Sequence, residues 1–416
     1  MATIKPFRGI RPVSNLVRRI VSPPYDVLNP EEARALANED PLTFVRVIRP
    51  EVDFPAHIDP HSPEVYDRGA SNLRELIESG NLIMDETPRF YIYELARDRH
   101  FQRGLMCGLS LDEYDRGLIR RHELTISEKE LDRARHMQAL EANTGLVLAT
   151  YRAMGAIDRL VDGICDASSP VSEVISPDGV SHRLWAVDGR HNIRRLEGFF
   201  AEAEALYIAD GHHRAAAAAR YRGIKREHDS GSGREGPWDY FLGVLFPHDQ
   251  LRIFGYNRLI RDLGGLDRQT LLDRIGESFI ISKAGHILPD RPKLFGMYLE
   301  GEWYRLEALE GTYPKDDPVL SLDVSILQKN LLAPVLGIGD PREDRRVDFL
   351  SGRNAVAEME TRCGRDMKLA FTLFPLKIEQ VMLIADRGVI MPPKSTWFEP
   401  KLLSGLVVRS LKGPIS

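Results

Sequence analysis

One stretch of this chain, residues 206–221, constrains its fold more than any other. It reads L-Y-I-A-D-G-H-H-R-A-A-A-A-A-R-Y. The apolar residues Leu206 to Ala209 predict the end of a short buried strand, and the alanines from Ala215 predict the start of a helix. Asp210-Gly211 between them permits a tight turn, because glycine adopts backbone angles that other residues avoid. A strand, a turn and a helix in succession are typical of proteins that mix the two kinds of element.

The junction before the predicted helix carries His212, His213 and Arg214. The first N–H groups of a helix lack partners inside the helix, and the helix dipole favours negative charge at that end. The planar guanidinium of Arg214 matches the oxygens of a phosphate. The junction is therefore a candidate phosphate-binding turn. A capped surface turn with exposed histidines is an alternative that these residues leave open.

A second strand-to-helix junction precedes the first. The segment L-I-R-R-H-E-L-T leaves a predicted strand, and Ser127 with Glu130 three residues later forms a capping-box pattern at the start of a helix. His122 and Glu123 lie between the two elements, where a carboxylate can serve as a general base. We expect Glu123 to share one pocket with Asp210, on adjacent strands. A glutamate in an exposed loop is the alternative.

Two loops are stiffened by proline. The segment S-P-P-Y-D-V at 22–27 is extended and carries Tyr25 and Asp26, and it is followed by a predicted helix that Asn29 caps. The segment M-P-P-K-S-T at 391–396 offers a lysine and two hydroxyl groups that suit a phosphate or a carboxylate. Both segments are candidate walls of the site, and rigid surface loops are the alternative.

The hydrophobic pattern predicts further elements. It indicates strands at 43–50, 89–95 and 104–111, and helices at 65–80 and 154–164. A chain of 416 residues is long enough for two or three domains. We expect an N-terminal α/β region at 1–110, a core with the turn at 111–250, and a C-terminal α/β region at 251–416.

Composition narrows the class of protein. The net charge of −5 argues against general nucleic-acid binding. The three cysteines, Cys107, Cys165 and Cys363, lie far apart and form no C-x-x-C pair, which is typical of a reduced compartment. The sequence begins with charges and prolines, and no apolar run is as long as a membrane-spanning helix. We expect a cytoplasmic protein with no membrane or nucleic-acid partner, and the oligomeric state stays open.

Five segments, taken in this order, resemble the family called domain of unknown function 1015. They are S-P-P-Y-D-V at 22–27, R-P-E at 49–51, R-H-E-x-T at 121–125, A-D-G-H-H-R at 209–214 and M-P-P-K-S-T at 391–396. The resemblance extends from about residue 4 to residue 409. This family resemblance alone implies no activity.

His122-Glu123, followed by residues 210–214, is also similar to motifs of the archaeal free-serine kinase, a member of the ParB/sulfiredoxin superfamily. In that enzyme a proline-His-Glu segment carries the catalytic glutamate, and V-D-G-H-H-R grips nucleotide phosphates. Here Arg121 replaces the proline, and 86 residues separate Glu123 from Asp210. The similarity implies a mixed α/β (α+β) fold with a ParB/sulfiredoxin-like nucleotide-binding core and large N- and C-terminal extensions.

The same similarity implies roles for particular residues. Glu123 would be the base, and Asp210 would be catalytic and would bind Mg²⁺. The phosphates of the donor, ATP or ADP, would be held by Gly211, His212, His213 and Arg214. Apart from this similarity, the candidates to hold the acceptor are His122 and residues of the two proline-stiffened loops, namely Asp26, Tyr25, Lys394, Ser395 and Thr396.

The function predicted from these roles is a phosphotransferase. It would transfer a phosphoryl group from the nucleotide to a small hydroxyl metabolite, with free L-serine favoured and O-phosphoserine as product. One alternative is a non-catalytic, ParB-like regulatory protein that binds CTP or ATP. Another is a metal-dependent hydrolase built on His122, Glu123, His212 and His213, although adjacent histidines are poorly placed to share one metal ion.

Overall fold

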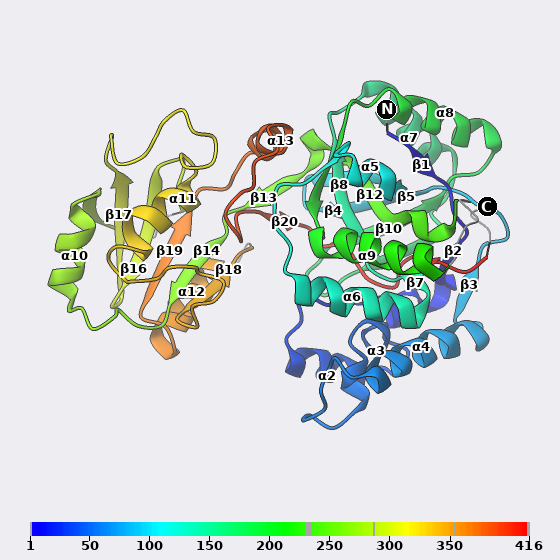
Figure 1. The fold of residues 1–416 in the computed structure, drawn as a ribbon, viewed down its shortest axis with the longest axis horizontal. Helices are drawn as coiled ribbons and strands as arrows, with labels where there is room; N and C mark the ends of the chain where they lie inside the picture. The colour runs from blue at the N-terminus through cyan, green and yellow to red at the C-terminus, as the bar shows by residue number, and fades with distance from the viewer. Residues whose placement is uncertain (1, 229–234, 286–287, 353–354, 414–416) are drawn as a thin grey trace. The chain divides into compact units, whose positions relative to one another are not determined.

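The computed structural model describes residues 2–228, 235–285, 288–352 and 355–413. Its contacts divide the chain into two compact units. The first unit comprises residues 1–251 and 400–416, and the second, residues 252–399, is inserted between those two parts (Figure 1). The region expected at 251–416 therefore gives its last residues to the first unit.

The first unit is built on a mixed sheet, in which the described residues form nine strands. The order along the sheet is β6 (Ile119–Arg120), β11 (Leu206–Asp210), β8 (Val147–Tyr151), β12 (Tyr240–Pro247), β5 (His100–Ser110), β4 (Tyr91–Arg97), β10 (Ser181–Ala186) and β9 (Ser172–Ile175), with β1 (Ile4–Lys5) paired to β5. β11 is parallel to β6, and β12 is parallel to β8. The other pairs are antiparallel.

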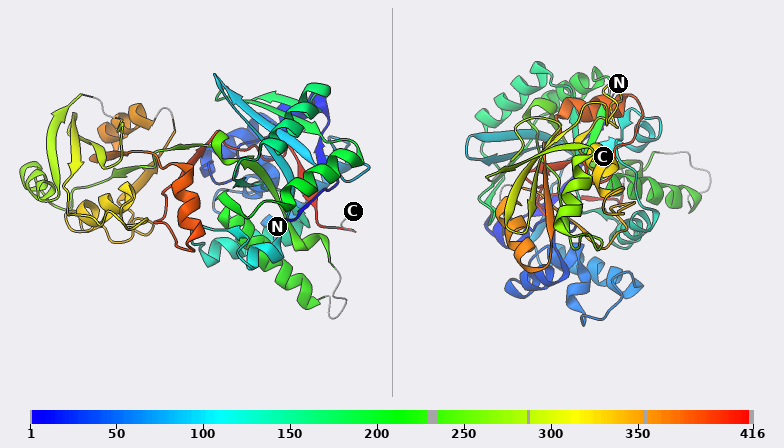
Figure 2. Two further views of the ribbon diagram at one scale, coloured as in Figure 1. Left: turned by 90° about the horizontal axis from the view of Figure 1, so that it is seen from above. Right: turned by 90° about the vertical axis from the view of Figure 1, so that its left-hand side faces the viewer.

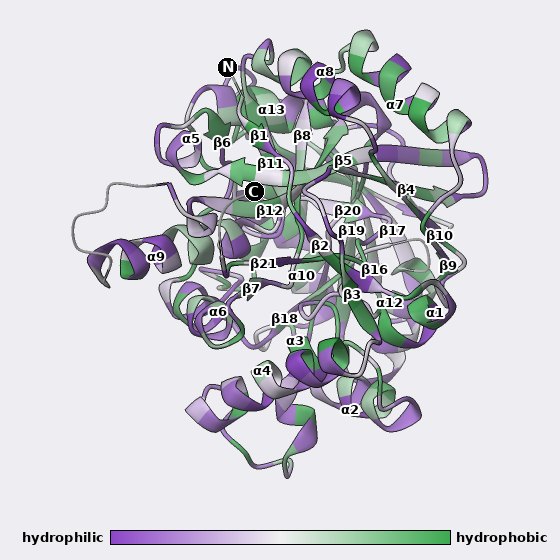
Figure 3. Cartoon of the chain, turned by 90° about the vertical axis from the view of Figure 1, so that its right-hand side faces the viewer, coloured by the Kyte–Doolittle hydropathy of each residue, from purple (hydrophilic) through white to green (hydrophobic). Residues whose placement is uncertain are grey.

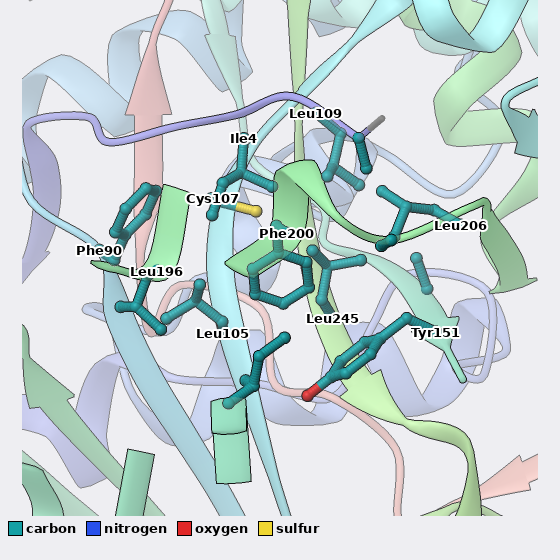
Figure 4. Packing of buried hydrophobic residues seen from close by; sticks show 14 of the residues in the cluster. Ile4, Phe90, Leu105, Cys107, Leu109, Tyr151, Leu196, Phe200, Leu206 and Leu245 are labelled. Atoms are coloured by element: carbon teal, nitrogen blue, oxygen red, sulfur yellow. The ribbon is translucent and has the colours of Figure 1, made fainter. Parts of the chain in front are cut away.

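Four helices belong to this sheet: α5 (Leu111–Asp115), α7 (Gly155–Ala167), α8 (Arg190–Ala201) and α9 (His212–His228). α7 and α8 are amphipathic, and Figure 3 colours each of them partly hydrophilic and partly hydrophobic. The apolar side of α8 buries Leu196 and Phe200. These side chains meet alternate residues of β5, namely Leu105, Cys107 and Leu109, in one hydrophobic core (Figure 4). Alternation along the strand thus selects the face that the helices cover.

A smaller sheet joins the two ends of the first unit. Its order is β3 (Leu82–Met84), β2 (Gly9–Pro12), β21 (Val408–Ser410) and β7 (Ala142–Asn143). The helices α1 (Val17–Ile20), α2 (Pro30–Glu39), α3 (Val45–Ile48), α4 (Pro63–Glu78) and α6 (Ser127–Leu140) complete this part of the unit. α2 begins as expected, because the side chain of Asn29 accepts a hydrogen bond from the backbone N–H of Glu32 at 2.9 Å.

The strand expected at 43–50 is wrong. Residues 45–48 form the short helix α3, and Phe44, Val47 and Ile48 are buried in the same core cluster. A helical turn satisfies its backbone groups locally, so it can be buried among other helices where a strand would need a paired neighbour. The Ile48 N–H donates to the Phe44 carbonyl oxygen at 3.1 Å. Packing has overridden the preference of valine and isoleucine for strands.

The capping box expected at Ser127 does not form. α6 begins at Ser127, but Ile126 occupies the cap position and no side chain caps the helix. The carboxylate of Glu130 instead accepts a hydrogen bond from the Thr125 hydroxyl. α6 packs beside α9, which begins at His212 and therefore starts three residues before the predicted Ala215 (Figure 1).

The second unit contains its own sheet (Figure 2). The order is β15 (Phe279–Ala284), β17 (Glu302–Ala308), β16 (Leu294–Leu299), β19 (Leu369–Leu373), β14 (Asn257–Ile260) and β18 (Val347–Leu350). Its helices are α10 (Arg268–Gly276), α11 (Asp323–Leu327), α12 (Ala355–Arg365) and α13 (Ile378–Asp386). The unit starts and ends on a ribbon of two paired strands, β13 (Arg252–Phe254) and β20 (Trp397–Glu399).

Short helical turns complete the described elements. They are η1 (Ser14–Leu16), η2 (Pro50–Asp53), η3 (Pro237–Asp239), η4 (His248–Gln250) and the π-helical turn η5 (Gln328–Leu332), which continues α11. The chain is a mixed α/β protein with several sheets. Among the helices of the described segments, none combines the length and the apolar character needed to cross a bilayer.

Candidate functional site

The turn between β11 and α9 is held in a conformation that requires glycine. β11 ends at Asp210, and α9 begins at His212. Gly211 joins them with a φ of +97°, which residues with a Cβ rarely adopt. α9 packs closely on the sheet because Ala215 and Ala218 are buried in its core. The strand, turn and helix expected from the sequence are therefore confirmed, and the backbone of the turn is fixed on both sides.

The guanidinium of Arg214 joins three segments of the first unit. One terminal nitrogen donates to the carbonyl oxygen of Leu146 and the other to Oδ2 of Asp26, each at 2.6 Å. The same group lies 5.4 Å from the centroid of the Tyr25 ring. Burial alone would lower the pKa of Arg214, but the negative charge of Asp26 opposes it and the pKa is raised. Arg214 is therefore a permanent cation, and among the described residues its buried Nε has no hydrogen-bond partner.

Asp210 forms an ion pair with Lys401, a residue close to the C-terminal end of the sequence. Nζ of Lys401 lies 2.9 Å from Oδ2 of Asp210. Burial raises the pKa of Asp210, but the charges of Lys401 and Arg214 outweigh burial, so the pKa falls well below its ordinary value. Asp210 is therefore an anion at neutral pH. The side chains of Lys401 and Asp210 remain 24% and 35% exposed, so a ligand from solvent can reach both.

The second junction lies beside the first. β6 runs parallel to β11, with Ile119 opposite Leu206, so the loops that leave these two strands emerge at the same edge of the sheet. This confirms the expected adjacency of the strands. Oε2 of Glu123 lies 3.8 Å from Nδ1 of His212, and the Glu123 side chain is 33% exposed. A carboxylate thus faces both solvent and the first helical turn of α9.

His122 and His212 form a buried pair beneath that carboxylate. Their rings meet edge to face, with centroids 4.4 Å apart. Burial lowers the pKa of His122 to about 4, and burial together with the neighbouring His122 lowers the pKa of His212 well below its ordinary value. Both imidazoles are therefore neutral at pH 7.

Unlike the neighbouring His212, His213 forms a hydrogen bond with the loop before α6. Its Nε2 accepts a hydrogen bond from the backbone N–H of Ile126 at 3.1 Å. The contact ties the loop that carries His122 and Glu123 to the start of α9. His213 therefore holds the two junctions together.

A small pocket is lined in part by Arg214. Its volume is about 40 Å³, and its lining includes Tyr25, Arg133, Gly145 and Arg214. The guanidinium of Arg133 lies 4.4 Å from the centroid of the Tyr25 ring, so two cations flank one aromatic ring. Burial is the main cause that raises the pKa of Tyr25, so its hydroxyl stays protonated at neutral pH. A larger groove of about 500 Å³ lies between α7 and α8, but none of the predicted site residues lines it.

The loop at 391–396 belongs to the second unit. Lys394 has a φ of +56°, and its carbonyl oxygen accepts a hydrogen bond from the buried Arg258 at 2.9 Å. The Ser395 hydroxyl donates to the Pro392 carbonyl oxygen at 2.6 Å. The two hydrogen bonds hold the loop at Lys394 and at Pro392. A role for Lys394, Ser395 and Thr396 in the site stays a prediction.

The carboxylates and histidines of the site do not form a ready-made metal cage. Across the segments that the structure describes, no three His, Cys, Asp or Glu side chains are arranged to hold a metal ion. The donor set does fit Mg²⁺ that arrives with phosphates, because that ion commonly takes only one or two protein carboxylates. A role for Asp210 as its ligand stays a prediction.

Sequence analysis missed two cations at this site. Arg133 lies in α6 and Lys401 in the segment P-K-L-L-S, and neither belongs to a motif with a predicted role. Lys401 stands 191 residues after Asp210, so only tertiary structure brings the two together. One signal was available for Arg133, because α6 was expected to follow the loop that carries Glu123.

Fold and site together define a class: a mixed α/β protein in which a strand-to-helix turn presents a buried arginine and an aspartate beside a second, carboxylate-bearing loop. The chain belongs to the family described as "Protein of unknown function (DUF1015)", whose model matches residues 4–325. No curated protein sequence matches this chain significantly.

Several solved structures are similar to this chain at low sequence identity. A free serine kinase in complex with AMP is 12% identical, with a TM-score of 0.35, and the similarity covers 71% of this chain and 86% of that chain. SbnI from Staphylococcus aureus, with a C-terminal truncation, is 10% identical, with a TM-score of 0.38 and coverage of 74% and 87%. A conserved hypothetical protein from Pyrococcus furiosus is 14% identical, with a TM-score of 0.34 and coverage of 71% and 90%.

Proposed function

We propose that this protein is a nucleotide-dependent small-molecule kinase that phosphorylates the hydroxyl of free L-serine. One observation carries the proposal: a solvent-accessible carboxylate, Glu123, lies 3.8 Å from His212 in the first turn of the candidate phosphate-binding helix. Phosphoryl transfer to an alcohol needs a base for the hydroxyl proton and cations for the phosphates, held in line with each other. The two adjacent junctions supply both.

In this mechanism, Glu123 accepts the proton of the serine hydroxyl. The oxygen then forms a bond to the terminal phosphorus of ATP or ADP, and the bond from that phosphorus to the bridging oxygen of the nucleotide breaks. The proton stays on Glu123 until it is released to solvent, and the shortened nucleotide leaves with the negative charge on its former bridging oxygen. The neighbouring pair His122 and His212 is buried and neutral, so it places no positive charge beside Glu123 that would make its carboxylate a weaker base.

Arg214 is the principal phosphate ligand in this proposal. Its guanidinium is held by Leu146 and Asp26, with which a phosphate oxygen would compete. Arg214 would then exchange one anionic partner, the carboxylate of Asp26, for another, the phosphate, so its guanidinium keeps a charge-assisted hydrogen bond. Once released, Asp26 is an anion at the edge of the site that suits the ammonium group of an amino acid. Mg²⁺ bound with the nucleotide would be held by Asp210 and would neutralise phosphate charge.

The decisive experiment is a screen for the acceptor. The purified protein is incubated with labelled ATP, ADP or CTP, Mg²⁺ and a panel of free amino acids and small polyols, and products are identified by mass spectrometry. We expect O-phosphoserine from serine. In the variant E123Q the amide keeps the shape of the side chain but cannot accept a proton, so turnover should fall by roughly two to four orders of magnitude.

Nucleotide affinity provides the control for that variant. Glu123 serves the acceptor and not the phosphates, so E123Q should bind ATP or ADP as tightly as the parent. If nucleotide binds tightly and no compound in the panel is phosphorylated, the kinase proposal fails. The alternative of a nucleotide-binding regulatory protein would then explain the site better.

A further inference from the structure

A short backbone bridge fixes two segments that reach the turn from opposite ends of the chain. The N–H of Ser22 donates to the carbonyl oxygen of Ser404 at 3.1 Å. In return, the N–H of Ser404 donates to the carbonyl oxygen of Ser22 at 2.9 Å. Four residues after Ser22 comes Asp26, which pairs with Arg214. Three residues before Ser404 comes Lys401, which pairs with Asp210. One bridge thus holds an anion and a cation against the two charged ends of the turn.

The position of Lys401 does not depend on its own ion pair. The N–H of Leu403 donates to the Tyr93 hydroxyl of β4 at 3.2 Å, and that hydroxyl lies 2.7 Å from Nδ1 of His182 in β10. The backbone around Lys401 is therefore anchored to the sheet at residue 403 and to the segment before α2 at residue 404. Replacing the lysine side chain leaves these anchors in place.

We infer that Lys401 is a phosphate-binding residue of this site, contributed by the segment that follows the inserted unit. The inference rests on the proposed function, since it takes the turn as a nucleotide phosphate site. The ammonium group lies 2.9 Å from the last residue of β11, at the entrance to the helix whose first turn would bind the phosphates. An ammonium has three N–H donors and can bond a carboxylate and a phosphate at the same time.

The local charges support this role. Asp210 is ionised at neutral pH and would repel a polyphosphate if it stood alone at the turn. Lys401 cancels that charge, and its side chain stays accessible to solvent. With a second cation beside Arg214, the site should bind nucleotides with several phosphates more tightly, because each added phosphate brings more negative charge to the two cations.

Two explanations for Lys401 must be separated by the test. The lysine could bind phosphate directly, or it could act only by neutralising Asp210. A double-mutant cycle distinguishes them. Dissociation constants for AMP, ADP and ATP are measured by calorimetry without Mg²⁺, so that D210N does not also remove the proposed metal ligand, for the parent, K401M, D210N and the double variant. K412M is the matched control, because Lys412 also pairs with a carboxylate, that of Glu141, but not at the turn.

We expect K401M to weaken ATP binding roughly ten- to a hundredfold, and AMP binding less, with K412M unchanged. The same loss should persist when K401M is made in the D210N protein. If D210N and the double variant bind ATP equally, Lys401 acts only through Asp210 and the inference is wrong. Equal affinity of K401M and the parent would also overturn it, while the kinase proposal would stand. If the parent binds none of the three nucleotides, the proposed function fails first.

Discussion

His136 shows how burial turns a single residue into a determinant of stability. Its Nε2 lies 2.8 Å from the carbonyl oxygen of Val47 in α3, and the edge of its ring faces Tyr66 of α4. Burial and the charge of Arg133 lower the pKa of His136 from 6.5 to about 4, against the opposing effects of the Val47 hydrogen bond and of Asp132. The imidazole is therefore neutral in the folded protein across the whole range from pH 7 to pH 5.

This shift predicts how stability depends on pH. As the pH falls below 6.5, His136 takes up a proton in the unfolded chain but not in the folded one until about pH 4. Unfolding then binds protons, so stability is complete above pH 6.5 and is lost between pH 6.5 and 4. Each such histidine changes the free energy of unfolding by at most about 1.4 kcal/mol per pH unit.

The variant H136Q removes the titrating group and keeps a donor for Val47. We expect its free energy of unfolding, measured with urea at pH 7 to 4.5, to fall less steeply than that of the parent. H57Q, at an exposed histidine, should follow the parent. A slope in H136Q equal to that of the parent would mean that His136 already titrates normally in the folded state.

At the scale of one element, the turn before α9 depends on backbone conformation more than on side-chain chemistry. A Cβ at Gly211 would lie 3.4 Å from Cα of Val147, an ordinary contact, so space is available. The obstacle is the φ of +97°. Later in the same helix, Gly223 has open space around its Cα and an ordinary helical backbone.

The two glycines should therefore respond in opposite directions to alanine. G211A should destabilise the protein by about 1–3 kcal/mol, because a non-glycine residue is strained there. G223A should stabilise it by up to about 1 kcal/mol, because alanine is the better helix former. Urea unfolding of both variants checks the pair. Equal effects of the two substitutions would show that the positive φ carries no strain.

At the scale of the whole molecule, the inserted unit has ends that meet. Arg252 in β13 is the register partner of Glu399 in β20. Paired residues on neighbouring strands lie about 5 Å apart, so a linker of a few residues can join Leu251 to Pro400 once the insertion is removed. Each unit has its own sheet and its own buried cluster.

We expect both pieces to fold when separated. The isolated segment 252–399 and the shortened chain with a glycine-serine linker should each unfold cooperatively in urea, monitored by circular dichroism. An unfolded product from either piece would contradict this independence. The shortened chain also tests the loop at 391–396: if ATP affinity and serine turnover persist without it, Lys394, Ser395 and Thr396 take no part in the site.

Particular residues show where prediction from sequence succeeded. The turn at Asp210-Gly211 was recognisable because an apolar run, a glycine and an alanine run impose three different local structures in succession. The cap at Asn29 was recognisable because an asparagine followed by a proline is a local signal for the start of a helix. The strand predicted at 43–50 was wrong because a short apolar segment is compatible with a strand or with a buried helix. The neighbours that decide between the two are distant in sequence.

The sequence by itself determined the mixture of helices and strands, the two junctions that carry Glu123 and Asp210, and membership of the family. These properties depend on local patterns, whose physical causes act within a few residues. Only the tertiary structure decided that Asp26 meets Arg214 and that Lys401 meets Asp210. The two residues of each pair are 188 and 191 positions apart in the sequence. Such contacts arise from the packing of distant segments, and no local sequence pattern determines which partner a charged side chain will meet.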